Sequence, residues 1–166
     1  INNRQVLNGL LEQLGLRDQA TPILRALDKL AKTDAETVME EMTRQSTATT
    51  EQAAKILSLV QVTGTNGEIL DQLEKLADGH EATLEGIEAL RHVIEGTQAA
   101  GVAQDALVLD VSIARGLDYY TGTIYETFLN ALPQIGSVCS GGRYDNLTGV
   151  YTKQELPGVG ASLGLD

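Results

Sequence analysis

The 166-residue chain combines 42% hydrophobic residues with a formal charge of −11, from 12 basic and 23 acidic side chains. That hydrophobic content is too high for a disordered chain, and no apolar run reaches the about 18 residues of a membrane span. A single cysteine, Cys139, excludes an internal disulfide. The acidic surplus argues against a broad nucleic-acid-binding face, so we expect an acidic, soluble, cytoplasmic globular protein.

The composition changes near residue 105. All six aromatic residues lie at or beyond Tyr119, and nine of the 17 glycines lie within residues 106–166. The first part is rich in Leu, Ala and Glu, which favour helices, whereas the second part has the β-branched, aromatic and glycine residues of strands and turns. The sequence therefore predicts an α+β fold with a helical first part.

Short amphipathic helices are predicted throughout the first part, from apolar residues at helical spacing. In chain order they cover residues 2–15, 23–31, 35–44, 51–60, 66–76 and 82–99. Asn2 or Asn3, Asp34 and Thr50 are the expected N-caps, and Gly15 and Gly101 are the expected stops. Asn66 and Gly67 either form a turn or begin the fifth helix.

Four strands are predicted in the second part. They cover residues 106–113, 123–129, 135–140 and 158–163, with turns at Pro133-Gln134 and at Gly141-Gly142. Because strands joined by short turns pair in opposite directions, we expect an antiparallel sheet.

A dense polar cluster lies between the first two predicted strands, at residues 115–123. Arg115 carries a planar fork that suits a carboxylate or a phosphate. Tyr119 and Tyr120 are adjacent, so on a strand they point to opposite faces, and one of them can line a pocket. The alternative is an ordinary hairpin in which Arg115 pairs with Asp118.

A second cluster follows the third predicted strand, at residues 140–145. Gly141 and Gly142 allow backbone N–H groups to approach a ligand closely, and Tyr144 offers a hydroxyl. The alternative is a tight turn after the strand, with Arg143 and Asp145 as a surface pair of little energetic value. Cys139 is expected to be a small strand residue without a thiolate role.

Together, the two clusters resemble the signatures of the histidyl-tRNA synthetase family. Residues 114–126 read A-R-G-L-D-Y-Y-T-G-T-I-Y-E, and residues 138–147 read V-C-S-G-G-R-Y-D-N-L. Residues 157–166 resemble the approach to motif 3 of class II synthetases, and residues 1–4 resemble the segment after motif 2. The resemblance implies part of a class II antiparallel sheet with flanking helices, plus an all-α insertion domain.

The same resemblance implies a division of the chain. Residues 1–19 would form a catalytic-core helix, residues 20–98 a helical insertion domain, and residues 99–166 the C-terminal part of the catalytic core. Motifs 1 and 2, the motif 3 arginine and the anticodon-binding domain have no counterpart in this sequence. We therefore expect an internal piece of a synthetase, inactive by itself, with weak tRNA binding because of its −11 charge.

The family activates histidine with ATP, accompanied by Mg²⁺, and passes the histidyl group to tRNA(His) as a homodimer. By resemblance, Arg115 is the catalytic residue and binds both the histidine carboxylate and the α-phosphate of ATP. The implied histidine-binding residues are Arg115, Tyr119, Tyr120, Ser140, Gly141, Gly142 and Tyr144, with Tyr120 bonded to the imidazole. The remaining ATP residues would lie outside this sequence, so no bound ATP or metal is expected on the piece alone.

Two other functions are compatible with the sequence. One is a histidine-sensing paralogue, a regulatory subunit or domain that keeps the synthetase fold with a relaxed catalytic signature. Here Arg115, Asp118, Tyr119 and Tyr120 match the synthetase form, which favours the ligase. The other is an independent helical interaction module formed by residues 20–98.

Overall fold

A four-stranded sheet lies at one side of the molecule in the computed structural model, which describes residues 1–30, 32–113, 119–150, 152–154 and 156–164. The strands are β1 (Asn2–Asn3), β2 (Thr123–Phe128), β3 (Ser137–Tyr144) and β4 (Gly158–Leu163), in the spatial order β1-β2-β3-β4. All three pairings are antiparallel, as predicted. The first strand comes from the helical part of the sequence, so the two ends of the chain share one sheet.

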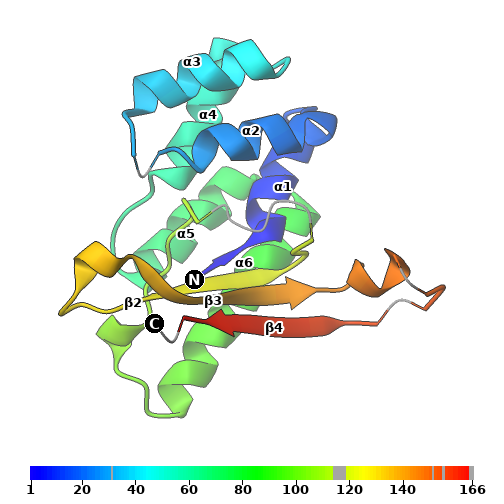
Figure 1. Ribbon diagram of the computed structural model, residues 1–166. Helices are drawn as coiled ribbons and strands as arrows, with labels where there is room; N and C mark the ends of the chain where they lie inside the picture. Colours follow the sequence, from blue (N-terminus) through cyan, green and yellow to red (C-terminus); the bar gives the residue numbers. More distant parts are fainter. Residues whose placement is uncertain (31, 114–118, 151, 155, 165–166) are drawn as a thin grey trace.

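Six α-helices form the rest of the described fold (Figure 1). They are α1 (Arg4–Gln13), α2 (Ala20–Leu27), α3 (Ala35–Gln45), α4 (Thr50–Val60), α5 (Asn66–Ala77) and α6 (Glu81–Ala99). Figure 1 shows α1 between the sheet and the group formed by α2, α3 and α4. All six predicted helices are present, and Asn66 begins a helix instead of a turn. The second lies at Ala20–Leu27 and not at residues 23–31, because residues 28–30 form turns. None of the helices in the described ranges is long and apolar enough to cross a membrane.

Local capping explains where several helices begin. The side chains of Asn3 and Asp34 accept hydrogen bonds from the first turns of α1 and α3, which confirms both predicted caps. The cap predicted at Thr50 is wrong by one residue, because Thr49 and Gln52 form a reciprocal capping box. Thr65 and Glu68 form a second box at the start of α5.

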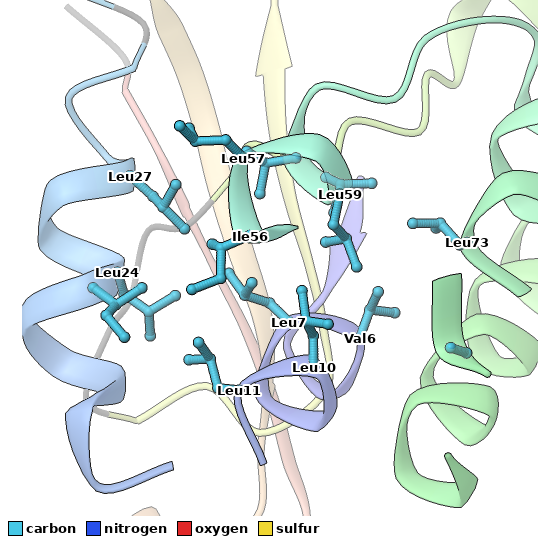
Figure 2. Packing of buried hydrophobic residues seen from close by; sticks show 14 of the residues in the cluster. Val6, Leu7, Leu10, Leu11, Leu24, Leu27, Ile56, Leu57, Leu59 and Leu73 are labelled. Carbon is cyan, nitrogen blue, oxygen red and sulfur yellow. The ribbon is translucent and has the colours of Figure 1, made fainter. Parts of the chain in front are cut away.

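One hydrophobic core joins these helices, and α1 runs through its middle. Leu7 and Leu11 of α1 lie in the same buried cluster as Leu24 of α2 and Ile56 of α4 (Figure 2). The buried cluster continues without a break from residues 1–19 into residues 20–98. The division of the chain into a core and an insertion domain therefore remains a prediction, because this packing does not separate two cores.

The strand predicted at residues 106–113 is wrong. Gln104–Ala106 form a short 3₁₀ helix, and Asp110 closes a turn by accepting hydrogen bonds from the backbone N–H and the hydroxyl of Ser112. Leu109 and Val111 are buried on either side of exposed Asp110, so the alternating pattern does report burial. The segment is held mainly by Ile1, Asn2 and Asn66 instead of by a continuous ladder.

The predicted turn at Gly141-Gly142 is also wrong. Both glycines lie inside β3 and are buried, opposite Tyr125 and Ile124 of β2. A methyl group added at Gly141 would lie 2.3 Å from the Gly160 carbonyl oxygen and 2.5 Å from the Tyr125 hydroxyl. Glycine occurs here because an aromatic ring crosses the strand, so these residues continue the sheet. The strands near residues 123–129 and at Gly158–Leu163 are confirmed.

Candidate functional site

The two polar clusters meet where the chain approaches β2 and where β3 ends. The Thr121 backbone N–H donates to the Arg143 carbonyl oxygen over 2.9 Å. The Thr121 hydroxyl donates to Asp145 Oδ2 over 2.9 Å and accepts from the Asp145 backbone N–H over 3.1 Å. Residues 24 positions apart in the sequence are thereby fixed side by side.

Asp145 forms the predicted pair with Arg143 and also binds Thr121. Arg143 Nε donates to both carboxylate oxygens, over 3.0 and 3.1 Å. These hydrogen bonds, followed by that from Thr121, hold the pKa of Asp145 below its ordinary value. Asp145 is therefore ionised at neutral pH and ties the clusters together. The sequence did not predict the contact between Thr121 and Asp145, because no local pattern marks it.

Three tyrosine rings gather at this junction. The ring centroids of Tyr119 and Tyr120 lie 4.3 Å apart, and those of Tyr120 and Tyr144 lie 6.5 Å apart. Tyr119 and Tyr144 meet edge to face, with centroids 6.4 Å apart. The separations of 6.4 and 6.5 Å are those of favourable aromatic pairs, whereas Tyr119 and Tyr120 lie closer together than that range. The prediction that Tyr119, Tyr120 and Tyr144 lie together is thus supported by the geometry of the rings.

Glycines make room for these rings. A methyl group at Gly142 would lie 2.9 Å from Cδ1 of Tyr120, and one at Gly158 would lie 2.4 Å from Cε2 of Tyr144. Both separations are shorter than carbon–carbon contacts allow. The glycines of β3 and β4 therefore let the tyrosine rings lie directly on the sheet.

A pocket of about 220 Å³ opens beside Tyr120. It is lined by Ile113, Tyr119, Tyr120, Ile124, Tyr125, Glu126, Ser140 and Gly141. Four of the predicted site residues are among them, while Gly142 and Tyr144 adjoin the tyrosine rings from outside the lining. Glu126 adds a carboxylate that sequence reasoning had given no role. Arg115, with the rest of residues 114–118, lies outside the described residues.

A second pocket, of about 320 Å³, lies across the tyrosine pair. Its lining includes Asn8 of α1, Thr21 of α2 and Asn146, together with Tyr119 and Tyr120. The two tyrosines therefore contribute to both pockets. The smaller pocket contains more of the predicted residues, so it is the candidate site.

Tyr120 is held in its protonated form. Desolvation, followed by hydrogen bonding to Tyr119, raises the pKa of Tyr120 from 10.0 to about 12. At neutral pH the hydroxyl is therefore neutral and able to donate one hydrogen bond and accept another.

We expect one tyrosine of this chain to ionise near pH 12. Because the folded pKa lies above the unfolded value, the unfolded state loses its proton first, and the free energy of unfolding falls as pH rises from 10 to 12. The ultraviolet absorbance of phenolate measures this ionisation. Tyr120→Phe should remove the late step; a titration of the same shape in that variant would contradict the assignment.

Comparison with known proteins gives one consistent result. A sequence profile described as histidyl-tRNA synthetase matches residues 1–166. The histidine–tRNA ligase of Rhodopirellula baltica is 57% identical over 166 residues, which are 100% of this chain and 38% of that protein. That of Clostridium tetani is 44% identical over 165 residues, which are 99% of this chain and 37% of that protein. The chain therefore spans less than two fifths of the length of these curated relatives.

Solved structures agree with the sequence comparisons. The crystal structure of histidyl-tRNA synthetase from Nostoc sp. has a TM-score of 0.91 and 37% identity, covering 99% of this chain and 39% of that one. A Bacillus halodurans structure described as an ATP phosphoribosyltransferase regulatory subunit/histidyl-tRNA synthetase has a TM-score of 0.78 at 20% identity, covering 98% of this chain and 40% of that one. At that identity the second likeness concerns the fold alone.

Proposed function

The chain belongs to the histidyl-tRNA synthetase family, and from this we propose that it forms part of a histidine–tRNA ligase. That enzyme would join histidine to ATP as histidyl-adenylate and then transfer the histidyl group to tRNA(His). The observation that carries the proposal is the pocket beside Tyr120, where both sequence signatures contribute residues. Cytoplasmic location and a homodimeric full-length enzyme are parts of the same proposal.

Histidine would bind in the pocket of about 220 Å³. The neutral hydroxyl of Tyr120 would form a hydrogen bond with the imidazole, and Tyr119 would support the ring of Tyr120. Ser140, Gly141 and Gly142 of β3 would form the facing wall, completed by Tyr144. An amino acid without ring nitrogens would leave the Tyr120 hydroxyl unpaired, and this gives selectivity for histidine.

Arg115 would bind the histidine carboxylate and the α-phosphate of ATP together. In the first step a histidine carboxylate oxygen attacks the α-phosphorus, the bond from that phosphorus to the β-phosphate oxygen breaks, and pyrophosphate leaves, while negative charge grows on the phosphate oxygens. A fixed guanidinium lowers this barrier because its fork can hold two oxygens at once. Arg115 is the residue of this chain that we assign to catalysis.

Magnesium would accompany ATP in the complete enzyme. Within the described ranges, no group of three His, Cys, Asp or Glu side chains lies close enough to hold a metal ion. Since Mg²⁺ on a nucleotide needs only one or two protein carboxylates, the placement of its ligands outside this chain stays a prediction from the family resemblance.

Residues 1–19 and 99–166 would belong to the catalytic core, and residues 20–98 would form the helical insertion. Support comes from the sheet, because β1 of the first segment pairs with β2 of the last one. The shared hydrophobic core would then fix the insertion firmly against α1.

A chimaeric ligase tests the proposal, in which residues 1–166 replace the matching segment of the Rhodopirellula baltica enzyme. We expect histidine-dependent exchange of pyrophosphate into ATP, and no exchange with other amino acids. Thermal unfolding and histidine binding serve as controls for an intact preparation. A chimaera that binds histidine without exchange would contradict the ligase and favour the histidine-sensing alternative.

A further inference from the structure

The side chain of Asn2 is buried at the edge of the proposed histidine pocket, with 1% of its surface exposed. Its Nδ2 donates to the carbonyl oxygens of Val111 and Ile113, both over 3.0 Å, and its Oδ1 accepts from the Asn3 backbone N–H over 2.7 Å. Both amide hydrogens and the carbonyl are thus engaged. A buried amide with every group satisfied is a costly arrangement to lose.

Asn2 also belongs to the sheet that forms the wall of this pocket. In the ladder between β1 and β2 it lies opposite Ile124. Ile124 and Ile113 both line the pocket. Asn2 therefore connects two parts of the pocket wall. Its backbone lies beside β2, and its side chain holds residues 111 and 113, which precede the first signature.

Residues 107–113 need this connection because they form no regular strand. The Asp110 carboxylate accepts hydrogen bonds from Ser112, and as an acceptor it cannot satisfy the carbonyls of Val111 and Ile113, which need a donor. The primary amide of asparagine has two N–H donors, so this one short side chain can bond both carbonyls at once.

Asn66 binds the other end of residues 107–113 through its side-chain amide. Its Nδ2 donates to the Leu107 carbonyl oxygen, and its Oδ1 accepts from the Leu109 backbone N–H, both over 2.8 Å. Neither Leu107 nor Leu109 is among the residues that line the pocket. Asn66 thus makes a comparable pair of hydrogen bonds at a distance from the site.

We propose that Asn2 is a positioning residue of the histidine site: its amide fixes Val111 and Ile113, and thereby places the wall of the pocket that Ile113 and Ile124 form beside Tyr120. Asn66 contributes stability to the same segment without placing the pocket. The inference rests on the proposed function for the identity of the ligand, and on the contacts of Asn2 for the positioning itself.

The matched variants Asn2→Asp and Asn66→Asp test this inference in the chimaeric ligase. Each keeps the acceptor oxygen, loses the N–H donors and adds one negative charge. For Asn2→Asp we expect the KM for histidine in pyrophosphate exchange to rise about tenfold or more, with the KM for ATP within about twofold. Asn66→Asp should lower the unfolding temperature while leaving the KM for histidine within about twofold.

A second readout needs no histidine. In the chain itself, the uncharged variant Asn2→Ser should move the late tyrosine ionisation from about 12 toward 10, because the pocket around Tyr120 loosens, whereas Asn66→Ser should not. If Asn2→Asp is insoluble, Asn2→Ser and Asn66→Ser also serve for the KM comparison. Equal effects of the Asn2 and Asn66 variants on both readouts would reduce Asn2 to a merely structural role and overturn the inference.

The two proposals fail separately. If the unsubstituted chimaera shows no exchange, the ligase function falls, and the tyrosine titration still decides the role of Asn2. If exchange is normal, Asn2→Asp leaves the KM for histidine unchanged and Asn2→Ser leaves the titration unchanged, the positioning role falls and the ligase function stands.

Discussion

Gly86→Ala is expected to destabilise this chain by about 2 kcal/mol, although alanine is the better helix former by about 1 kcal/mol. Gly86 lies in α6 where that helix crosses α1. A methyl group there would lie 2.9 Å from the backbone nitrogen of Val6 and 2.9 Å from Cβ of Gln5. Neither atom can move without shifting α1, so the overpacking outweighs the gain in helix propensity.

A glycine of α1 makes the same kind of close contact with α6. A methyl group at Gly9 of α1 would lie 2.2 Å from the Thr83 hydroxyl and 2.9 Å from its backbone nitrogen. Each helix thus places a glycine against the backbone of the other. The Arg4 backbone N–H at the start of α1 donates to the Gly122 carbonyl oxygen over 3.0 Å. A displaced α1 would therefore also disturb the chain next to the tyrosine cluster.

Urea and thermal unfolding measure this effect, with a fall in the unfolding temperature of roughly 4–8 °C. Gly96→Ala is the matched control on the same helix. Gly96 is exposed, and a methyl group there meets no atom within 4 Å. That variant should gain about 0.5–1 kcal/mol from helix propensity alone. Stabilisation by both substitutions would show that the two helices are not in close contact at Gly86.

Arg115→Ala should lower the rate of adenylate formation by the chimaeric ligase about a hundredfold. The substitution removes the charge that stabilises the growing negative charge on the α-phosphate, and losses of this size follow the removal of one such donor. Arg115→Lys should recover only part of the rate, because an ammonium restores the charge without the two-oxygen fork. Histidine-dependent pyrophosphate exchange and single-turnover formation of the adenylate are the measurements.

Arg17→Ala provides the control for a lost surface arginine. Arg17 pairs with Glu12 over 2.9 Å, with both side chains largely exposed, so its loss should change stability and rate very little. A fall of less than about tenfold for Arg115→Ala would show that Arg115 does not carry the catalytic role. Equal losses for the two variants would lead to the same conclusion.

The sequence predicted most of the helical part because helix signals are local. Asp34 caps a helix three residues away from its hydrogen-bond partner Thr37. The box formed by Thr65 and Glu68 was readable in the same way, as a threonine followed three residues later by a glutamate. Such contacts form within one turn, so they leave a trace at a fixed short spacing.

The signatures likewise indicated the family, and they named the tyrosines that the structure brings together. Tyr119 and Tyr120 are neighbours in the sequence, and the glycines that precede Tyr144 mark close approach. The sequence could not predict which side chains lie against these glycines. Gly141 and Gly142 suggest a turn when read alone, and they are strand residues because β3 pairs at these positions with both β2 and β4.

By itself, therefore, the sequence determined the helices, the antiparallel strands near residues 123–129 and 158–163, and the family. Only the tertiary structure decided that residues 107–113 are irregular, that Thr121 binds Asp145, and that Asn2 holds Val111 and Ile113. The physical reason is the distance between partners along the chain. Helix caps join residues within one turn, whereas Asn2 finds its partners 109 and 111 positions away, after the chain has folded.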